Sequence, residues 1–60
     1  NPEAFHAAVL RRIKTRLDAS DKPGADFLIT TIDLLATTNE RFAGDLLEQC
    51  QKLRLQYRIA

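Results

Sequence analysis

The sequence predicts an all-α domain built as a small antiparallel three-helix bundle. Two observations carry this prediction: apolar residues recur at helical spacing along most of the chain, and two segments rich in helix-ending residues divide it into three. Sixty residues make at most one domain, near the lower limit for a chain that buries its own core. With 45% hydrophobic and 28% charged residues, the composition is typical of a folded chain rather than a disordered one.

The first helix is expected over residues 2–19. Asn1 can cap it, Pro2 suits the first helical position because an N–H there has no partner, and Glu3 favours the positive end of the helix dipole. One face of this helix is apolar and the remaining circumference is basic. The apolar face consists of His6, Val9, Leu10, Ile13 and Leu17, with Phe5 at its margin.

The second helix is expected over residues 23–37. The segment SDKPG, residues 20–24, separates it from the first, because Pro23 disfavours helical geometry in the residue before it. Pro23 can then begin the new helix, with Asp21 or Ser20 near its cap. The stretch FLITTIDLL is rich in β-branched residues, but its consecutive apolar residues break the alternation that a strand requires. Since the connection is short, the two helices should be antiparallel neighbours.

The stretch ATTNERFAG, residues 36–44, decides whether a third helix begins or the second continues. Thr37 and Glu40 have the spacing of a capping box, in which both side chains satisfy backbone donors at a helix start. Asn39 favours caps over helix interiors, and Gly44 weakens a helix by about 1 kcal/mol relative to alanine. We therefore expect a break here and a third helix over residues 39–58.

The alternative is a helical hairpin in which one long second helix runs from about residue 24 to 58. It is favoured by a single stripe of residues that keeps helical spacing from end to end and is apolar except at Asn39. The stripe consists of Leu28, Ile32, Leu35, Asn39, Phe42, Leu46, Cys50, Leu53 and Tyr57. Such a helix would be roughly 50 Å long, and the first helix would cover about half of it. The exposed half would then need a second chain, so the hairpin would dimerise into a four-helix bundle.

Charge is segregated along the chain. Residues 1–24 carry a net charge of +2, residues 25–50 carry −4 and residues 51–60 carry +3. In an antiparallel bundle the first and third helices end at the same pole, which predicts a basic pole formed by Arg11, Arg12, Lys14, Arg16 and Lys52, near Arg54 and Arg58. Basic side chains at helix C-termini stabilise helices in any case, so this pole has a structural explanation as well as a functional one.

Chemistry at the level of single residues points away from an enzyme. His6 is expected to pack at the boundary of the core with one ring nitrogen satisfied, and Cys50 to be a buried, inert thiol. The carboxylates of Asp26, Asp33 and the later acidic residues read as a solvated face without a convergent pair. Neither a metal-ligand cluster nor a Gly-rich phosphate loop is present in the sequence, so no cofactor or metal is expected.

The leading functional hypothesis is a non-catalytic protein–protein interaction or oligomerisation module within a larger protein. The chain lacks an initiator Met and stops inside an apolar-periodic segment, so we expect residues 1–60 to be a single helical domain of a longer chain. The expected partner is a protein, such as an acidic or amphipathic helix, or a second copy. The predicted contact residues are Leu47, Arg54, Leu55, Arg58 and Ile59.

Two other functions stay open. The basic pole could bind nucleic acid, although its net charge is modest and no aromatic residue is interleaved with the arginines. The chain could also be a structural linker with no partner of its own. No apolar run approaches the roughly 20 residues of a membrane span, and a single cysteine favours an intracellular, reducing compartment.

Overall fold

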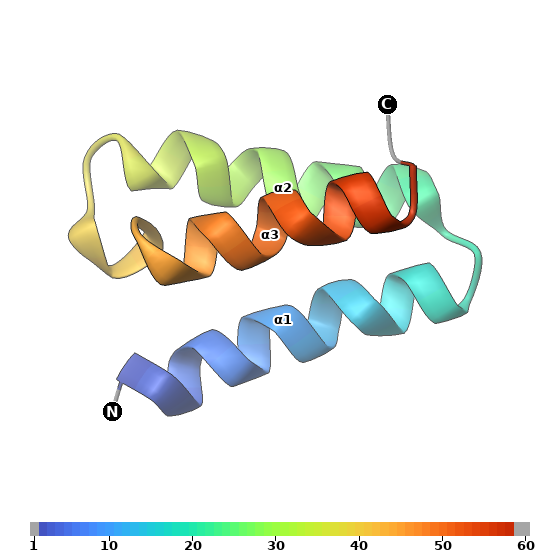
Figure 1. The fold of residues 1–60 in the computed structure, drawn as a ribbon, viewed down its shortest axis with the longest axis horizontal. Helices are drawn as coiled ribbons and strands as arrows, with labels where there is room; N and C mark the ends of the chain where they lie inside the picture. Colours follow the sequence, from blue (N-terminus) through green and yellow to red (C-terminus); the bar gives the residue numbers. More distant parts are fainter. Residues whose placement is uncertain (1, 59–60) are drawn as a thin grey trace.

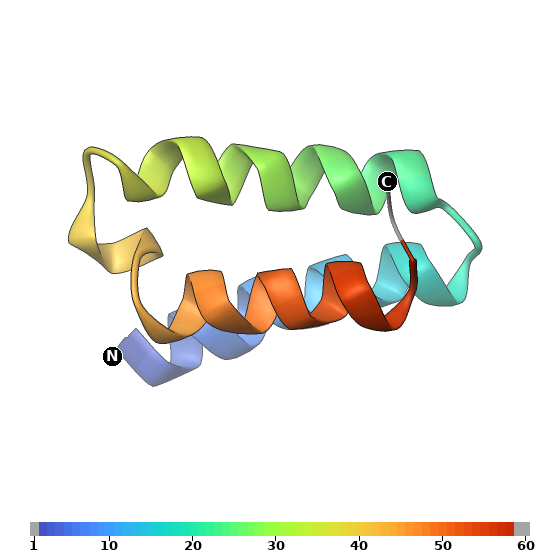
Figure 2. The same cartoon turned by 45° about the horizontal axis from the view of Figure 1, so that its top comes forward.

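Three α-helices lie side by side in the computed structural model, which describes residues 2–58 (Figure 1). They are α1 (Pro2–Asp18), α2 (Lys22–Ala36) and α3 (Asp45–Gln56), and a short 3₁₀ helix, η1 (Glu40–Phe42), precedes α3. Consecutive helices are antiparallel, so α1 and α3 both end at the pole where α2 begins (Figures 1 and 2). The predicted three-helix bundle is confirmed, and the alternative of one long second helix is wrong.

All three α-helices contribute to one apolar core. The buried side chains are Ile13, Leu17, Ala25, Ile29, Ile32, Leu46, Cys50 and Leu53. A ring of half-buried residues packs against them: Phe5, Val9, Leu10, Leu28, Phe42, Leu47 and Tyr57. The apolar faces predicted from helical spacing therefore point inward, except at Leu35 and Asn39, which are exposed.

The turn between α1 and α2 is built from backbone hydrogen bonds and one side-chain cap. The N–H of Ser20 donates to the carbonyl of Leu17 at 3.0 Å, and the N–H of Asp21 donates to the carbonyl of Arg16 at 2.8 Å. This pair of bonds is a Schellman motif, and Ser20 accordingly has a positive φ of 61°. Asp21 then caps α2, as predicted, by accepting a 2.9 Å bond from the N–H of Gly24.

The end of α2 is fixed by threonine hydroxyls that reach back into the helix. Thr37 Oγ1 donates to the carbonyl of Leu34 at 2.8 Å, and Thr38 Oγ1 donates to the carbonyl of Leu35 at 3.4 Å. The same two carbonyls also accept backbone bonds from the N–H groups of Thr37, Thr38 and Asn39, so the hydroxyls supplement the backbone bonds that close the last turn. The predicted capping box is therefore wrong, because Thr37 closes α2 instead of opening the next helix.

The third α-helix begins at Asp45 and not at residue 39. The Asn39 side chain caps η1 by accepting a 3.0 Å bond from the N–H of Arg41. Ala43 is then extended, with ψ of −179°, and Gly44 has φ of 68° and ψ of −126°. Two consecutive residues outside helical geometry prevent a continuous helix, and glycine is the residue that adopts such a φ at least cost.

Candidate interaction surfaces

The residues predicted as partner contacts on the third helix do not form one exposed patch in the described part of the chain. Leu55 is 80% exposed on the outer side of α3, and Arg58 is exposed just beyond its end. Leu47 is half-buried and packs against the core, while Arg54 is engaged with α2. Ile59 lies outside the described residues.

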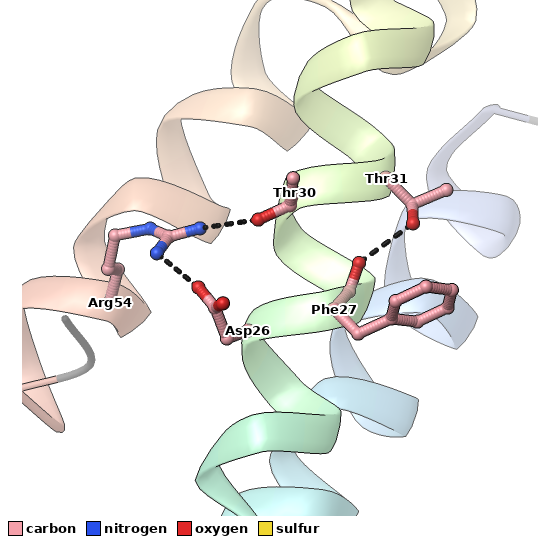
Figure 3. A network of polar contacts seen from close by, with 5 residues as sticks. All are labelled: Asp26, Phe27, Thr30, Thr31 and Arg54. Carbon is pink, nitrogen blue, oxygen red and sulfur yellow. Dashed lines mark hydrogen bonds and ion pairs between the residues drawn. The ribbon is translucent and has the colours of Figure 1, made fainter.

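Arg54 joins α3 to α2 through its guanidinium. Its Nη1 donates to Asp26 Oδ1 at 2.5 Å, and its Nη2 donates to the Thr30 hydroxyl at 3.4 Å (Figure 3). The two charged side chains are only 22% and 42% exposed, respectively, so water screens this pair less than a fully exposed one. Asp26 is thus an exception to the predicted solvated face of carboxylates, and Arg54 serves the α2–α3 contact.

The outer face of α2 carries large apolar side chains that face water. Phe27 is 71% exposed and Leu34 is 68% exposed, and these residues lie seven positions apart on one helix face with Thr31 between them. Figure 3 shows the Phe27 ring on the side of α2 away from Arg54. Leu35, also exposed, lies at the edge of this face. We call Phe27, Thr31, Leu34 and Leu35 the α2 strip.

The α2 strip is more apolar than its composition suggests. The hydroxyl of Thr31 donates to the carbonyl of Phe27 at 2.7 Å, so it is satisfied within the helix. The sequence analysis does not identify Phe27 and Leu34, because the continuous apolar stripe of this segment runs through Leu28 and Leu35 instead. The signal was their own spacing of seven residues, which places two large apolar side chains on one face outside that stripe.

A groove of about 380 Å³ runs between α1 and α3. It contains Lys14 from α1 and Lys52 from α3, so the structure brings these two members of the predicted basic pole together. Arg11 and Arg12 do not line the groove; both are exposed, and neither side chain makes an ion pair within residues 2–58. The groove is lined by Leu10, Lys14, Asp18, Gln49, Lys52, Leu53, Gln56 and Tyr57.

Carboxylates partly neutralise the predicted basic pole. Arg16 Nη1 lies 3.6 Å from Asp21 Oδ2, and Lys52 Nζ lies 3.8 Å from Glu48 Oε1. The side chains are 53% and 38% exposed in the first pair and 63% and 66% exposed in the second, so each pair contributes little to stability. Asp18 adds a further carboxylate at the same end of the bundle. The pole is therefore a mixture of charges in which the basic ones predominate.

His6 and Cys50 occupy the environments that the sequence predicts for them. His6 is half-buried, and its Nε2 donates to the carbonyl of Arg41 at 3.1 Å. Cys50 is fully buried in the core, and this burial raises the pKa of its thiol above the ordinary value, although the nearby Arg54 guanidinium acts in the opposite direction. A thiol held in its neutral form and away from water is a poor nucleophile.

Within residues 2–58, no group of three or more His, Cys, Asp or Glu side chains is placed to hold a metal ion. None of the helices in this range is long and apolar enough to cross a bilayer. Comparisons with protein-family models, with curated proteins and with solved structures found no match. A functional assignment for this chain therefore rests on its surfaces.

Proposed function

We propose that this chain is a non-catalytic helical module that binds another protein, and that the α2 strip is its main contact surface. The observation that carries this proposal is the exposure of Phe27 and Leu34, 71% and 68%, on one face of a regular helix. Neither side chain belongs to the core of the bundle. Exposed apolar side chains that lie together on one face of a small domain often mark a site of protein–protein interaction.

An amphipathic helix of the partner is the occupant that suits this surface. Phe27, Thr31 and Leu34 follow the i, i+4, i+7 spacing at which one helix presents anchors to another. Full burial of a large apolar side chain contributes about 1.5–3 kcal/mol, so two largely exposed anchors offer a useful part of a binding free energy. Self-association through the same strip is the alternative occupant.

Nucleic-acid binding receives less support from the same structure. Phosphate recognition requires cations that are free to replace counterions along a backbone. Here Arg16, Lys52 and Arg54 each lie beside a carboxylate, and Arg54 is held at the α2–α3 contact. Leu55, on α3, adds a further exposed apolar side chain that phosphate would not use.

The test is site-specific crosslinking in an extract of cells that make the full protein. A photoreactive amino acid replaces Thr31 within the α2 strip or, as a matched control, Thr15 on α1. The two threonines are comparable because each hydroxyl bonds to the carbonyl four residues earlier, Thr31 at 2.7 Å and Thr15 at 2.9 Å. We expect a discrete adduct from position 31 but not from position 15.

Leu34→Asp places a charge within the α2 strip and should abolish the adduct while circular dichroism stays helical. A second variant, Leu55→Asp, charges the exposed leucine of α3 and should leave the adduct intact. An adduct whose mass equals two copies of the chain would identify self-association through the strip. Adducts of equal yield from positions 31 and 15, or an adduct that persists in Leu34→Asp, would contradict the proposed surface.

A further inference from the structure

We propose that the groove between α1 and α3 is a second binding site, which takes an acidic amphipathic peptide segment. The inference deepens the proposed function, and it rests on that function only in treating the chain as a module that binds polypeptides. None of the residues that line the groove belongs to the α2 strip. The two surfaces can therefore be tested separately.

The groove has a size and a floor that suit a peptide side chain. Its volume, about 380 Å³, lies within the range of roughly 300–1,000 Å³ that is usual for ligand sites. Leu53 is buried and Leu10 is half-buried, so they provide an apolar floor, and the half-buried Tyr57 lies beside them. A leucine-sized side chain placed on this floor would bury apolar surface against Leu10 and Leu53.

The charge on the groove selects for carboxylates. Lys14 and Lys52 line it from opposite helices, and Asp18 is the one carboxylate among the lining residues of the described chain. Lys14 makes no ion pair within residues 2–58. Lys52 is paired with Glu48 only at 3.8 Å between exposed side chains, so an incoming carboxylate could replace that contact with little loss.

Three further polar groups favour a polypeptide over other anions. The side chains of Gln49, Gln56 and Tyr57 line the groove, and within residues 2–58 they make no hydrogen bond with the rest of the chain. A carboxamide both donates and accepts, which matches the alternating N–H and C=O groups of a peptide backbone. A polyphosphate would use only the donors and would leave the carboxamide oxygens without a partner.

A fatty acyl chain is a poorer match than a peptide. Six of the eight lining residues carry a polar group, and only the two leucines, Leu10 and Leu53, are purely apolar. A long hydrocarbon chain would leave those polar groups without water and without partners, which is unfavourable. An acidic peptide instead combines one apolar anchor with carboxylates for the lysines and a backbone for the amides.

The binding experiment uses fluorescence anisotropy with a labelled helical peptide made of Glu and Leu, and the same peptide with Gln in place of Glu. Lys14→Gln combined with Lys52→Gln removes both cations from the groove. Arg11→Gln combined with Arg12→Gln removes the same charge from α1 outside it, which provides the matched control. We expect the lysine variant to weaken the Glu–Leu peptide by about tenfold and the arginine variant by less than about twofold. The parent protein should bind the Gln peptide as weakly as the lysine variant binds the Glu–Leu peptide.

Chemical-shift mapping of the unmodified protein separates the two proposals. We expect the peptide to shift the side-chain amides of Gln49 and Gln56 and the ring of Tyr57. Shifts confined to Phe27 and Leu34 would overturn the groove site while supporting the α2 strip. Absence of binding, equal losses in the two double variants, or binding of phosphatidylserine vesicles without binding of the peptide would also overturn the groove site. None of these three results would change the outcome of the crosslinking test at position 31, which concerns the α2 strip.

Discussion

The Nε2 of His6 donates a hydrogen bond of 3.1 Å to the carbonyl of Arg41, which joins α1 to η1 across 35 residues of sequence. Aromatic contacts surround this bond. The rings of Phe5 and Phe42 meet edge to face with centroids 5.4 Å apart, and the Arg41 guanidinium lies 5.5 Å from the Phe5 ring centroid. We infer that this cluster holds η1 against α1, and thereby keeps the chain from continuing as one long helix.

Phe42→Ala tests the role of that cluster in stability. The half-buried Phe42 ring packs against the core and against Phe5, so we expect its loss to lower the free energy of unfolding by about 2 kcal/mol. Phe27→Ala is the matched control, because Phe27 is 71% exposed, and it should change stability by no more than about 0.5 kcal/mol. Denaturant titration followed by circular dichroism measures both, and equal losses would refute the assigned contacts.

Ser20→Gly should stabilise the protein. Ser20 has a φ of 61° in the Schellman motif that ends α1, and a residue with a Cβ is strained there. Relief of that strain exceeds the added flexibility of the unfolded chain, so we expect a net gain of up to about 1 kcal/mol. Thermal unfolding measures the effect, and a lower melting temperature for the glycine variant would show that the motif does not form.

Gly44→Ala should act in the opposite direction. A Cβ at this position would meet no atom within 4 Å, so space is not limiting. The backbone is limiting, because φ of 68° with ψ of −126° is a region that glycine alone occupies readily. We expect a loss of about 1–3 kcal/mol in the free energy of unfolding. An unchanged stability would instead favour a helix that runs through residue 44.

Cys50 should make stability fall in alkaline solution. Burial raises the pKa of its thiol in the folded state, so the folded chain keeps a proton that the unfolded chain releases above about pH 8.5. The contribution of the neutral Cys50 thiol to the free energy of unfolding is therefore complete below that pH, and it is lost as the pH rises toward the pKa of the thiol in the folded state. Cys50→Ala removes this group. The stability difference between the parent and Cys50→Ala, measured by denaturant titration from pH 7 to pH 10, should shrink as the pH rises. A constant difference would contradict the buried thiol.

Helical spacing and turn residues were sufficient to predict much of the fold. Periodicity alone predicts that Ile13, Leu17 and Cys50 point inward, and proline geometry predicts the SDKPG turn. The predicted start of the third helix is wrong because a threonine hydroxyl can bond either to the first turn of the helix that follows it or to the last turn of the helix that precedes it. Thr37 bonds to the carbonyl of Leu34 in the preceding helix. The segment that follows is held by the contact between Phe42 and Phe5, and periodicity does not reveal a contact between residues so far apart in the sequence.

Contacts between distant elements explain why the candidate surfaces were harder to predict. Arg54 and Asp26 lie 28 residues apart, and their pairing depends on the register between α2 and α3. Leu34 and Leu35 are adjacent leucines, so only the rotation of α2 in the bundle decides which one is more exposed. Lys14 and Lys52 were predicted at one pole, and the groove between them arises from packing that periodicity does not specify.

The most direct test of the central claim is the solvent accessibility of Leu34 in the unbound chain. Methyl NMR with a soluble paramagnetic chelate, at a concentration where sedimentation gives the monomer mass, compares Leu34 with the fully buried Leu46. If the α2 strip is open to a partner, we expect the chelate to broaden the Leu34 methyl signals strongly and to change those of Leu46 little. Equal protection of both leucines in the monomer would contradict it.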